Sequence, residues 1–335
     1  MSDENLILDI EHLSVRYETE DGIVHAVNDI NLKIGKKRTL GLVGETGAGK
    51  TTTALSILRL VPNPPGVVEC KKMVVEGKDI GALTPRQMEK VRGKEVSMIF
   101  QDPMTVLNPV FTVGQQIAET IEIHEHLSKE EAYEKALSML ELVGIPGTRA
   151  GEYPHQFSGG MKQRVVIAIA LACNPRLLIA DEPTTALDVT IQAQVLELMK
   201  NLKQQYDMSM ILITHDLGIV AEVCDEVAVM YAGRIVEQGT LEDIFCDTMH
   251  PYTEGLFNSL PNIHNRQAEL RPIPGMMTDP TNLPPGCAFA PRCTYATEAC
   301  SRKIPDLRNV GGTHLVACTA YDDPQFCIDR RNEHV

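Results

Sequence analysis

Eight residues from Gly44 to Thr51 carry the clearest chemical signal in this 335-residue chain. Their sequence, Gly-Glu-Thr-Gly-Ala-Gly-Lys-Thr, fits the pattern of a phosphate-binding P-loop. Glycines let backbone N–H groups turn toward phosphate oxygens, and the start of the next helix adds partial positive charge. We expect Lys50 to reach the β- and γ-phosphates and the Thr51 hydroxyl to bind Mg²⁺. The predicted ATP-binding residues of the loop are Gly44, Glu45, Thr46, Gly47, Ala48, Gly49, Lys50, Thr51 and Thr52.

The residues around this loop supply the context that a P-loop needs. The apolar run 39–43 predicts a buried strand, and residues 52–59 have the spacing of a helix. A glycine-rich turn without a ligand is the alternative interpretation, and the strand–loop–helix context counts against it. Tyr17 ends another predicted strand, so its ring can lie on adenine or can pack at a strand edge.

A second group of polar residues follows predicted buried strands. Asp181 ends a run of four apolar residues, where a carboxylate can hold Mg²⁺ directly or through water. Glu182 can orient or deprotonate the attacking water, and such general-base help is worth roughly 10²–10⁴-fold in rate. We expect Gln101 to meet Mg²⁺ or this water, and His215 to hydrogen-bond the γ-phosphate. Each residue alone is more typical of a surface or structural role, and the P-loop favours the catalytic interpretation.

Strands alternate with helices along most of the chain. This pattern predicts an α/β fold with a mostly parallel sheet core, an antiparallel β subdomain at the start and an inserted helical subdomain at about 102–175. Ligands of parallel sheets lie at the carboxyl ends of the strands, where Gly44, Asp181 and His215 all fall. We predict a nucleotide-binding domain over 1–246 and, because eight prolines lie between 251 and 291, a small irregular extension over 247–335.

Composition excludes some classes of function. A net charge of −14, no Trp and only 4% aromatic residues argue against a nucleic-acid-binding surface. The start of the chain is polar and acidic rather than a signal peptide, and no apolar stretch is long enough to span a membrane. We therefore expect a cytosolic protein that reaches a membrane only through a partner.

Taken together, six motifs resemble the ATP-binding cassette of ABC transporters. In order they are the P-loop, Gln101, the signature Phe157–Met161, the acidic segment Leu177–Glu182, the loop Ala186–Asp188, and His215. The resemblance covers residues 6–245 and implies an ATPase in which two cassettes sandwich two ATP molecules. It implies that the signature residues Ser158, Gly159 and Gly160 face the partner subunit and that Asp188 belongs to the D-loop. It also implies that Gln101 and residues 102–114 pass the motion to membrane subunits. Phe157 and Met161 depart from the common Leu-Ser-Gly-Gly-Gln signature.

A narrower resemblance covers nearly the whole chain. The segments Tyr153–Val165, His250–Thr253 and Pro284–Cys293 are similar to the D-type ATPases of oligopeptide/dipeptide importers. This implies a peripheral protein on the cytoplasmic face of the membrane, paired with a homologous F-type ATPase, two transmembrane permeases and an external peptide-binding protein. An importer for another solute such as nickel remains an alternative. A soluble cassette ATPase is disfavoured because the segment between Thr51 and Ser158 is too short for a repair-type coiled coil and only one cassette is present.

Five of the nine cysteines gather near the end of the chain, without the C-x₂-C spacing of common zinc sites. Four thiolates can hold Zn²⁺ or a [4Fe–4S] cluster, and free or disulfide-bonded cysteines are the third alternative. The resemblance favours iron–sulfur, with Arg292 expected to offset some thiolate charge and Cys327 outside the site. The predicted ligands are Cys287, Cys293, Cys300 and Cys318.

Overall fold

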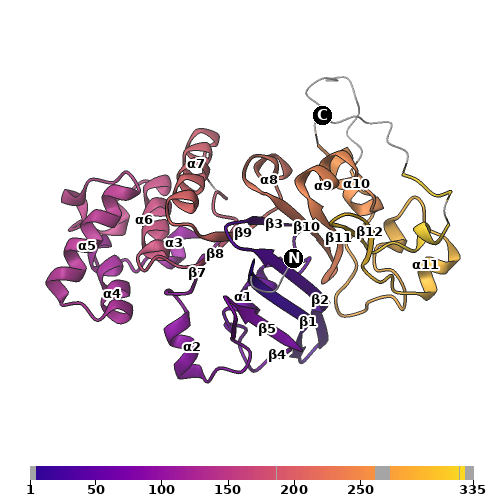
Figure 1. The fold of residues 1–335 in the computed structure, drawn as a ribbon, viewed down its shortest axis with the longest axis horizontal. Coiled ribbons are helices and arrows are strands. Elements are labelled where there is room, and N and C mark those ends of the chain that lie inside the picture. Colours follow the sequence, from indigo (N-terminus) through magenta and orange to yellow (C-terminus); the bar gives the residue numbers. More distant parts are fainter. Residues whose placement is uncertain (1–4, 186, 261–271, 324, 329–335) are drawn as a thin grey trace. The chain divides into compact units, whose positions relative to one another are not determined.

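The structure is a computed structural model that describes residues 5–185, 187–260, 272–323 and 325–328 (Figure 1). The chain forms two compact units. Unit 1 takes in the described residues of Met1–Leu8, Lys33–Thr39 and Val74–Ile213. Unit 2 takes in those of Asp9–Leu32, Leu40–Met73 and Thr214–Val335.

A set of parallel strands forms the core of unit 1. Strand β8 (Leu177–Asp181) pairs in parallel with β7 (Val96–Ile99) on one side and with β9 (Ser209–Thr214) on the other. All residues of these strands are buried, which explains why the sequence shows continuous apolar runs rather than alternation. Because parallel strands end at the same edge, the segments after β7 and β8 lie side by side.

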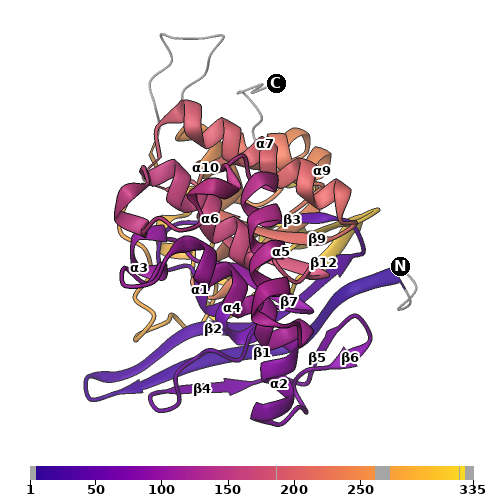
Figure 2. The ribbon, with the colours of Figure 1, turned by 90° about the vertical axis from the view of Figure 1, so that its left-hand side faces the viewer.

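The predicted helical subdomain is built from three packed helices in unit 1. Helix α4 (Val113–Glu125) packs against α5 (Lys129–Leu142), and both contact α6 (Gly159–Leu171) (Figures 1 and 2). Thr112 and Ser128 begin α4 and α5 with capping boxes, which satisfy the first N–H groups of each helix. The other elements here are α2 (Pro85–Val91), α3 (Pro103–Val106), α7 (Val189–Gln205), η2 (Gly147–Arg149), η3 (Pro154–Gln156), and the pair β5 (Lys72–Val75) and β6 (Lys78–Asp79).

Unit 2 contains a mixed set of strands that includes part of the C-terminal extension. Strand β10 (Glu226–Tyr231) pairs in parallel with β3 (Thr39–Val43) and antiparallel with β11 (Arg234–Thr240). Strand β13 (His314–Val316) pairs antiparallel with β11, and β12 (Arg308–Gly311) pairs antiparallel with β13. The sequence did not predict β12 and β13, which attach the extension to the sheet of the nucleotide-binding part.

The remaining elements of unit 2 are a second sheet and several helices and 3₁₀ turns. Strands β1 (Leu6–Thr19) and β2 (Gly22–Gly35) are neighbours in a second sheet, where β4 (Gly66–Glu69) pairs antiparallel with β1 (Figure 2). The helices and 3₁₀ turns are α1 (Lys50–Ile57), α8 (Leu217–Val223), α9 (Leu241–Cys246), α10 (Pro251–Asn258), α11 (Glu298–Arg302), η4 (Ala290–Arg292) and η5 (Thr319–Asp322).

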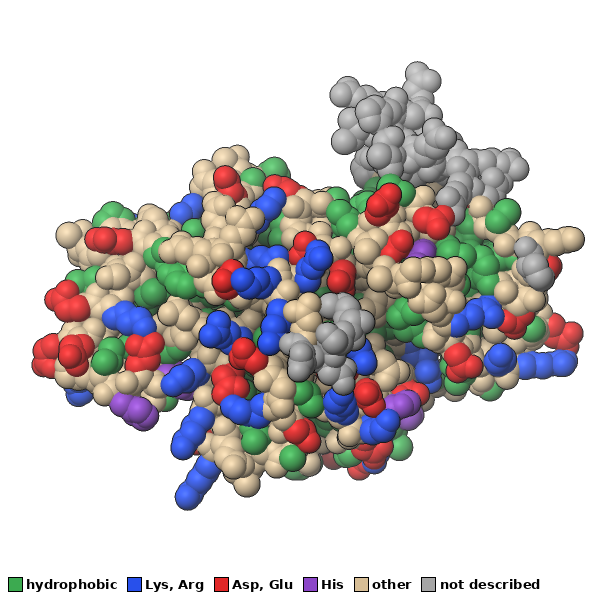
Figure 3. All heavy atoms as spheres, in the orientation of Figure 1, with side chains coloured by type: hydrophobic (Ala, Val, Ile, Leu, Met, Phe, Trp, Pro, Cys, Tyr) green, Lys and Arg blue, Asp and Glu red, His purple; other side chains and the backbone are tan. Residues whose placement is uncertain are grey.

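Charges of both signs are mixed over the face drawn in Figure 3, without a broad basic patch among the described residues there. Within the described ranges, the helices are all too short or too polar to cross a membrane.

Candidate nucleotide site

The loop between β3 and α1 requires glycine for steric reasons. Gly44 and Gly49 have φ angles of 151° and 103°, which few other residues adopt. A Cβ atom at Gly44 would lie 2.2 Å from the Met230 carbonyl oxygen, and one at Gly49 would lie 2.3 Å from that of Ala26. Gly49 also caps α1 without a side-chain hydrogen bond, which leaves the first N–H groups of the helix available to an anion.

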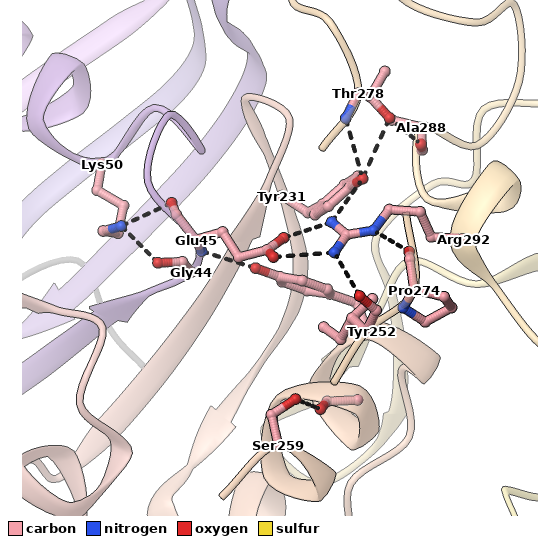
Figure 4. A network of polar contacts seen from close by, with 12 residues as sticks. Gly44, Glu45, Lys50, Tyr231, Tyr252, Ser259, Pro274, Thr278, Ala288 and Arg292 are labelled. Carbon is pink, nitrogen blue, oxygen red and sulfur yellow. Dashed lines mark hydrogen bonds and ion pairs between the residues drawn. The ribbon is translucent and has the colours of Figure 1, made fainter. Parts of the chain in front are cut away.

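Lys50 lies over this loop and bonds to it. Its side chain is buried, and Nζ donates hydrogen bonds to the carbonyl oxygens of Gly44 (2.6 Å) and Glu45 (3.0 Å) (Figure 4). Thr46 and Gly47 at the tip of the loop are exposed, as is Thr51 in the first turn of α1. The loop and the first turn of α1 therefore offer backbone N–H groups, one ammonium group and the exposed hydroxyls of Thr46 and Thr51, which suit a phosphate and a metal ion.

Glu45 has two partners that sequence reasoning missed. Its carboxylate forms a bidentate ion pair with Arg292, with N–O distances of 2.6 and 3.1 Å, and its N–H donates to the Tyr252 hydroxyl at 2.8 Å (Figure 4). The expectation that Arg292 offsets thiolate charge is therefore wrong. A carboxylate that accepts two guanidinium N–H groups is a stronger partner than a buried neutral thiol. No sequence signal links these residues, because 247 positions separate Glu45 from Arg292.

The carboxylates expected to handle Mg²⁺ and water lie at the ends of strands in unit 1. Asp181 ends β8 and is 3% exposed. The next residue, Glu182, has a left-handed backbone (φ 45°), and its N–H donates to Ile213 O at 2.9 Å. Its carboxylate accepts hydrogen bonds from Gln101 Nε2 at 2.8 Å and Thr185 Oγ1 at 3.0 Å. The structure thus brings together Gln101 and Glu182, 81 positions apart, as strand order predicts.

His215 directly follows β9 and is exposed. It precedes Asp216, whose side chain accepts hydrogen bonds from Gly218 N and Ile219 N and so begins α8. The position of His215 at a strand end matches the prediction, and its role toward a γ-phosphate stays a prediction.

The signature segment forms the exposed start of α6. Ser158 caps the helix by accepting a hydrogen bond from Met161 N at 3.4 Å, and Gly159 is exposed. A Cβ at Gly160 would lie 2.4 Å from Ile191 Cγ2, so this position is restricted to glycine as packed. An exposed helix start of this kind presents N–H groups and a partial positive charge, as an anion requires.

The two departures from the common signature share one contact partner. The Arg149 guanidinium lies 4.4 Å from the centroid of the Phe157 ring, and Arg149 Nη1 contacts Met161 Sδ at 3.4 Å. Glu152 holds the same guanidinium through hydrogen bonds of 2.6 to 3.1 Å. An aromatic ring and a thioether both suit a flat cation, so Phe157 and Met161 form one local packing unit with Arg149.

Asp188 of the predicted D-loop begins α7 and accepts a hydrogen bond from Ile191 N at 3.0 Å. Ala186, part of the same motif, lies outside the described residues. Tyr17 is half-buried on β1 opposite Gly66, with its ring 3.2 Å from where a Gly66 Cβ would be. The tyrosine therefore packs on β4, and contact with adenine stays a prediction.

The four predicted cluster cysteines line one cavity of about 10 Å³, together with His250 and Tyr295. Burial raises the pKa of Cys293 to about 12 and that of Cys318 to about 11. Burial also disfavours the Cys300 thiolate, but hydrogen bonds from Thr297 and Thr319 lower its pKa overall. Within the described ranges, no three His, Cys, Asp or Glu side chains are placed to hold a metal ion. Among the described residues, no two cysteines form a disulfide.

Comparison with known proteins places these features in a family. A profile described as "ABC transporter" matches residues 27–185, and one described as "Oligopeptide/dipeptide transporter, C-terminal region" matches residues 236–300. The oligopeptide transport ATP-binding protein OppD of Bacillus subtilis is 52% identical over 92% of this chain and 87% of its own length. The dipeptide transport ATP-binding protein DppD of the same organism is 49% identical over 98% of this chain and 96% of its own.

Solved structures agree on the fold. The protein cbiO1 from Clostridium perfringens, described as part of the ABC transporter complex cbiONQ, superposes with a TM-score of 0.62. It is 28% identical, covering 73% of this chain and 92% of its own. A dimeric ATP-binding cassette, MJ0796, described as bound to ADP and Pi, also gives a TM-score of 0.62 and, at 24% identity, shows the fold alone. The predicted P-loop cassette fold and ATPase activity are confirmed, and the chain belongs to the ATP-binding subunits of oligopeptide/dipeptide ABC transporters.

Proposed function

We propose that this chain hydrolyses ATP to power the uptake of di- or oligopeptides through a membrane transporter. The observation that carries the hydrolytic half is the 2.8 Å hydrogen bond between Gln101 and Glu182 at the edge of a buried parallel sheet. The peptide half is supported by the printed functions of relatives that align along nearly the whole chain.

The P-loop would bind the phosphates through its backbone N–H groups and Lys50. Mg²⁺ would be held by Thr51, Asp181 and Gln101, whose hydroxyl, carboxylate and amide oxygens are the hard donors that this ion prefers. Gln101 donates to Glu182 through Nε2, so its Oε1 is the atom available to the metal or to water. When bound, Mg²⁺ would offset charge on the β- and γ-phosphate oxygens.

Glu182 would act as the base. Two hydrogen bonds, from Gln101 and Thr185, fix the orientation of its carboxylate. A water molecule held by this carboxylate would attack the γ-phosphorus and pass its proton to Glu182, while the bond to the ADP oxygen breaks. His215 would hydrogen-bond the departing γ-phosphate.

A second cassette would complete each ATP site. The exposed helix start at Ser158, Gly159 and Gly160 would bind the ATP held by the partner's P-loop, beside Asp188 of the D-loop. We propose a homologous F-type ATPase as that partner, with two transmembrane permeases and an external peptide-binding protein. The chain would then be peripheral on the cytoplasmic face, with a nucleotide-binding domain over 1–246 and the extension over 247–335.

The test of the base is the variant Glu182→Gln, with Glu197→Gln on the exposed face of α7 as the matched control. We expect Glu182→Gln to bind ATP and to lose turnover by at least about 10²-fold, with ATP-bound dimers accumulating, because the amide cannot accept the proton. Equal turnover of Glu182→Gln and the control would refute Glu182 as the base.

The transported solute is tested in cells that carry Glu182→Gln in place of the wild-type chain. We expect loss of labelled di- and oligopeptide uptake, with nickel uptake intact. Loss of nickel uptake with intact peptide uptake would establish the alternative importer instead.

We also propose that Cys287, Cys293, Cys300 and Cys318 hold a [4Fe–4S] cluster, with Zn²⁺ as the alternative. Support comes from four thiols that line one cavity, which is the donor set of such a cluster. Among the described residues no three His, Cys, Asp or Glu side chains are placed to hold a metal ion, so the proposal rests on the shared cavity and on the thiol donor set. The cavity of about 10 Å³ would have to widen to admit a cluster.

Iron, acid-labile sulfide and zinc content per chain, measured on protein purified without oxygen, decide this question. Four iron and four sulfide, lost in Cys318→Ser and kept in Cys327→Ser, would support the cluster. One zinc without sulfide would support the alternative, and no metal would refute both.

A further inference from the structure

A carboxylate in a triphosphate-binding loop needs an explanation. Glu45 is the second residue of the P-loop, and its side chain is 33% exposed. A negative charge beside phosphates lowers their affinity, because like charges repel strongly where solvent screening is reduced. Neighbouring residues must therefore neutralise this carboxylate or direct it away from the phosphates.

Arg292 is the partner of this carboxylate in the structure. Its side chain is 5% exposed and forms the bidentate pair with Glu45. Its Nε donates to Pro274 O at 2.9 Å, and its guanidinium lies 5.8 Å from the centroid of the Tyr231 ring (Figure 4). A guanidinium fixed by the backbone and by an aromatic ring holds the carboxylate in one direction.

A second contact from the extension fixes the same peptide unit. The Tyr252 hydroxyl accepts a hydrogen bond from the Glu45 N–H, and Lys50 Nζ donates one to the Glu45 carbonyl oxygen. Tyr252 packs against Tyr231 and Phe289, with ring centroids 4.7 and 5.4 Å away. Backbone and side chain of Glu45 are thus held by residues that follow position 246.

We propose that Arg292 is a positioning residue for ATP binding, which neutralises Glu45 and turns its carboxylate away so that the loop presents N–H groups and Lys50 to the phosphates. This inference rests on the proposed ATP site. Through it, the extension contributes to nucleotide affinity from within the same chain.

The test measures equilibrium affinity of the full chain for the non-hydrolysable analogue AMPPNP, by displacement of fluorescent trinitrophenyl-ATP. The variants are Arg292→Ala, Glu45→Gln, the double variant and Arg292→Lys. Arg302→Ala is the control, since Arg302 lies in the same extension but is exposed and pairs only locally with Glu298. Circular dichroism checks that each variant is folded.

Two roles of the ion pair, neutralising the charge of Glu45 and merely stabilising the loop conformation, predict different results. We expect Arg292→Ala to weaken AMPPNP binding about fivefold to tenfold at low salt, and less at high salt because screening weakens the repulsion. Glu45→Gln should strengthen binding about twofold, and the double variant should return to within about twofold of the wild type, because both remove the negative charge. If the ion pair only stabilised the conformation of the loop, both Arg292→Ala and Glu45→Gln would weaken AMPPNP binding. The double variant would then bind no more tightly than either single variant.

Several outcomes would overturn the proposal. They are unchanged binding by folded Arg292→Ala, weaker binding by Glu45→Gln, or a double variant as weak as Arg292→Ala. If Arg292→Ala does not fold, Glu45→Gln and Arg292→Lys decide, with Arg292→Lys expected to stay within about threefold since it keeps the charge. A wild-type chain that binds no nucleotide probe would instead overturn the proposed ATP site.

Discussion

Glu237 on β11 is the residue whose removal we expect to detach the C-terminal extension most completely. It is fully buried and accepts three hydrogen bonds, from Met249 N (2.6 Å), His250 N (3.1 Å) and His314 Nε2 (2.8 Å). Met249 and His250 lie just before α10, and His314 begins β13. One carboxylate therefore joins the chain before α10 and the last strand pair to the sheet.

The magnitude follows from the groups left behind. Glu237→Ala leaves two backbone N–H groups and one imidazole nitrogen without their acceptor in a dry interior. Each unsatisfied group costs about 1–3 kcal/mol, so for three groups we expect a loss of at least about 3 kcal/mol. Glu237→Gln keeps one carbonyl acceptor, so about half of that loss is expected.

Hydrogen exchange measured by mass spectrometry suits this test, because a chain of this size need not unfold in one step. A loss of 3 kcal/mol corresponds to about hundredfold faster exchange through local opening, expected in α10 and in β13. The control is Gln238→Ala, the adjacent residue on β11, which is only half-buried. Exchange accelerated less than about fivefold in Glu237→Ala, or equally in the control, would refute the reasoning.

Two further predictions concern pH and the signature segment. Burial lowers the pKa of His250 from 6.5 to about 3. Between these two pH values the unfolded chain binds a proton that the folded chain does not bind. The contribution of His250 to stability is therefore fully present above pH 6.5 and is lost as the pH falls toward 3. The midpoint of thermal melts should fall between pH 7 and pH 5, and it should fall less in His250→Asn; an equal fall in both proteins would contradict this. Phe157→Leu should lower stability by about 1 kcal/mol through the lost Arg149 contact while ATP turnover persists, because Ser158 still caps α6; lost turnover in a fully stable variant would contradict it.

Local signals in the sequence predicted much of the architecture. Thr84, Ser128 and Ser158 each begin a helix, and all three are residue types that favour the N-cap position. The apolar runs that became β8 and β9 end at Asp181 and Thr214, so the catalytic candidates sit at strand ends. These features succeed because caps and buried parallel strands depend on residues close in sequence.

The extension was harder to predict because its contacts are distant in sequence. Strands β12 and β13 have four and three residues, too few to show periodicity. Their attachment depends on β11 and on the contact between His314 and Glu237, 77 positions away. Prolines and weak periodicity indicated an irregular segment, whereas pairing with a strand already in place allowed short strands to form.

The P-loop also depends on a contact between residues distant in sequence. Motif matching treats Glu45 as a variable position, since the pattern specifies only glycines, lysine and a hydroxyl residue. The structure shows that a glutamate at this position has a matching arginine after position 246, with both guanidinium arms on the carboxylate. A carboxylate without that arginine would repel the ligand that the motif exists to bind. The motif predicted where phosphate would bind, but only the folded extension explains why a negative charge is tolerated there.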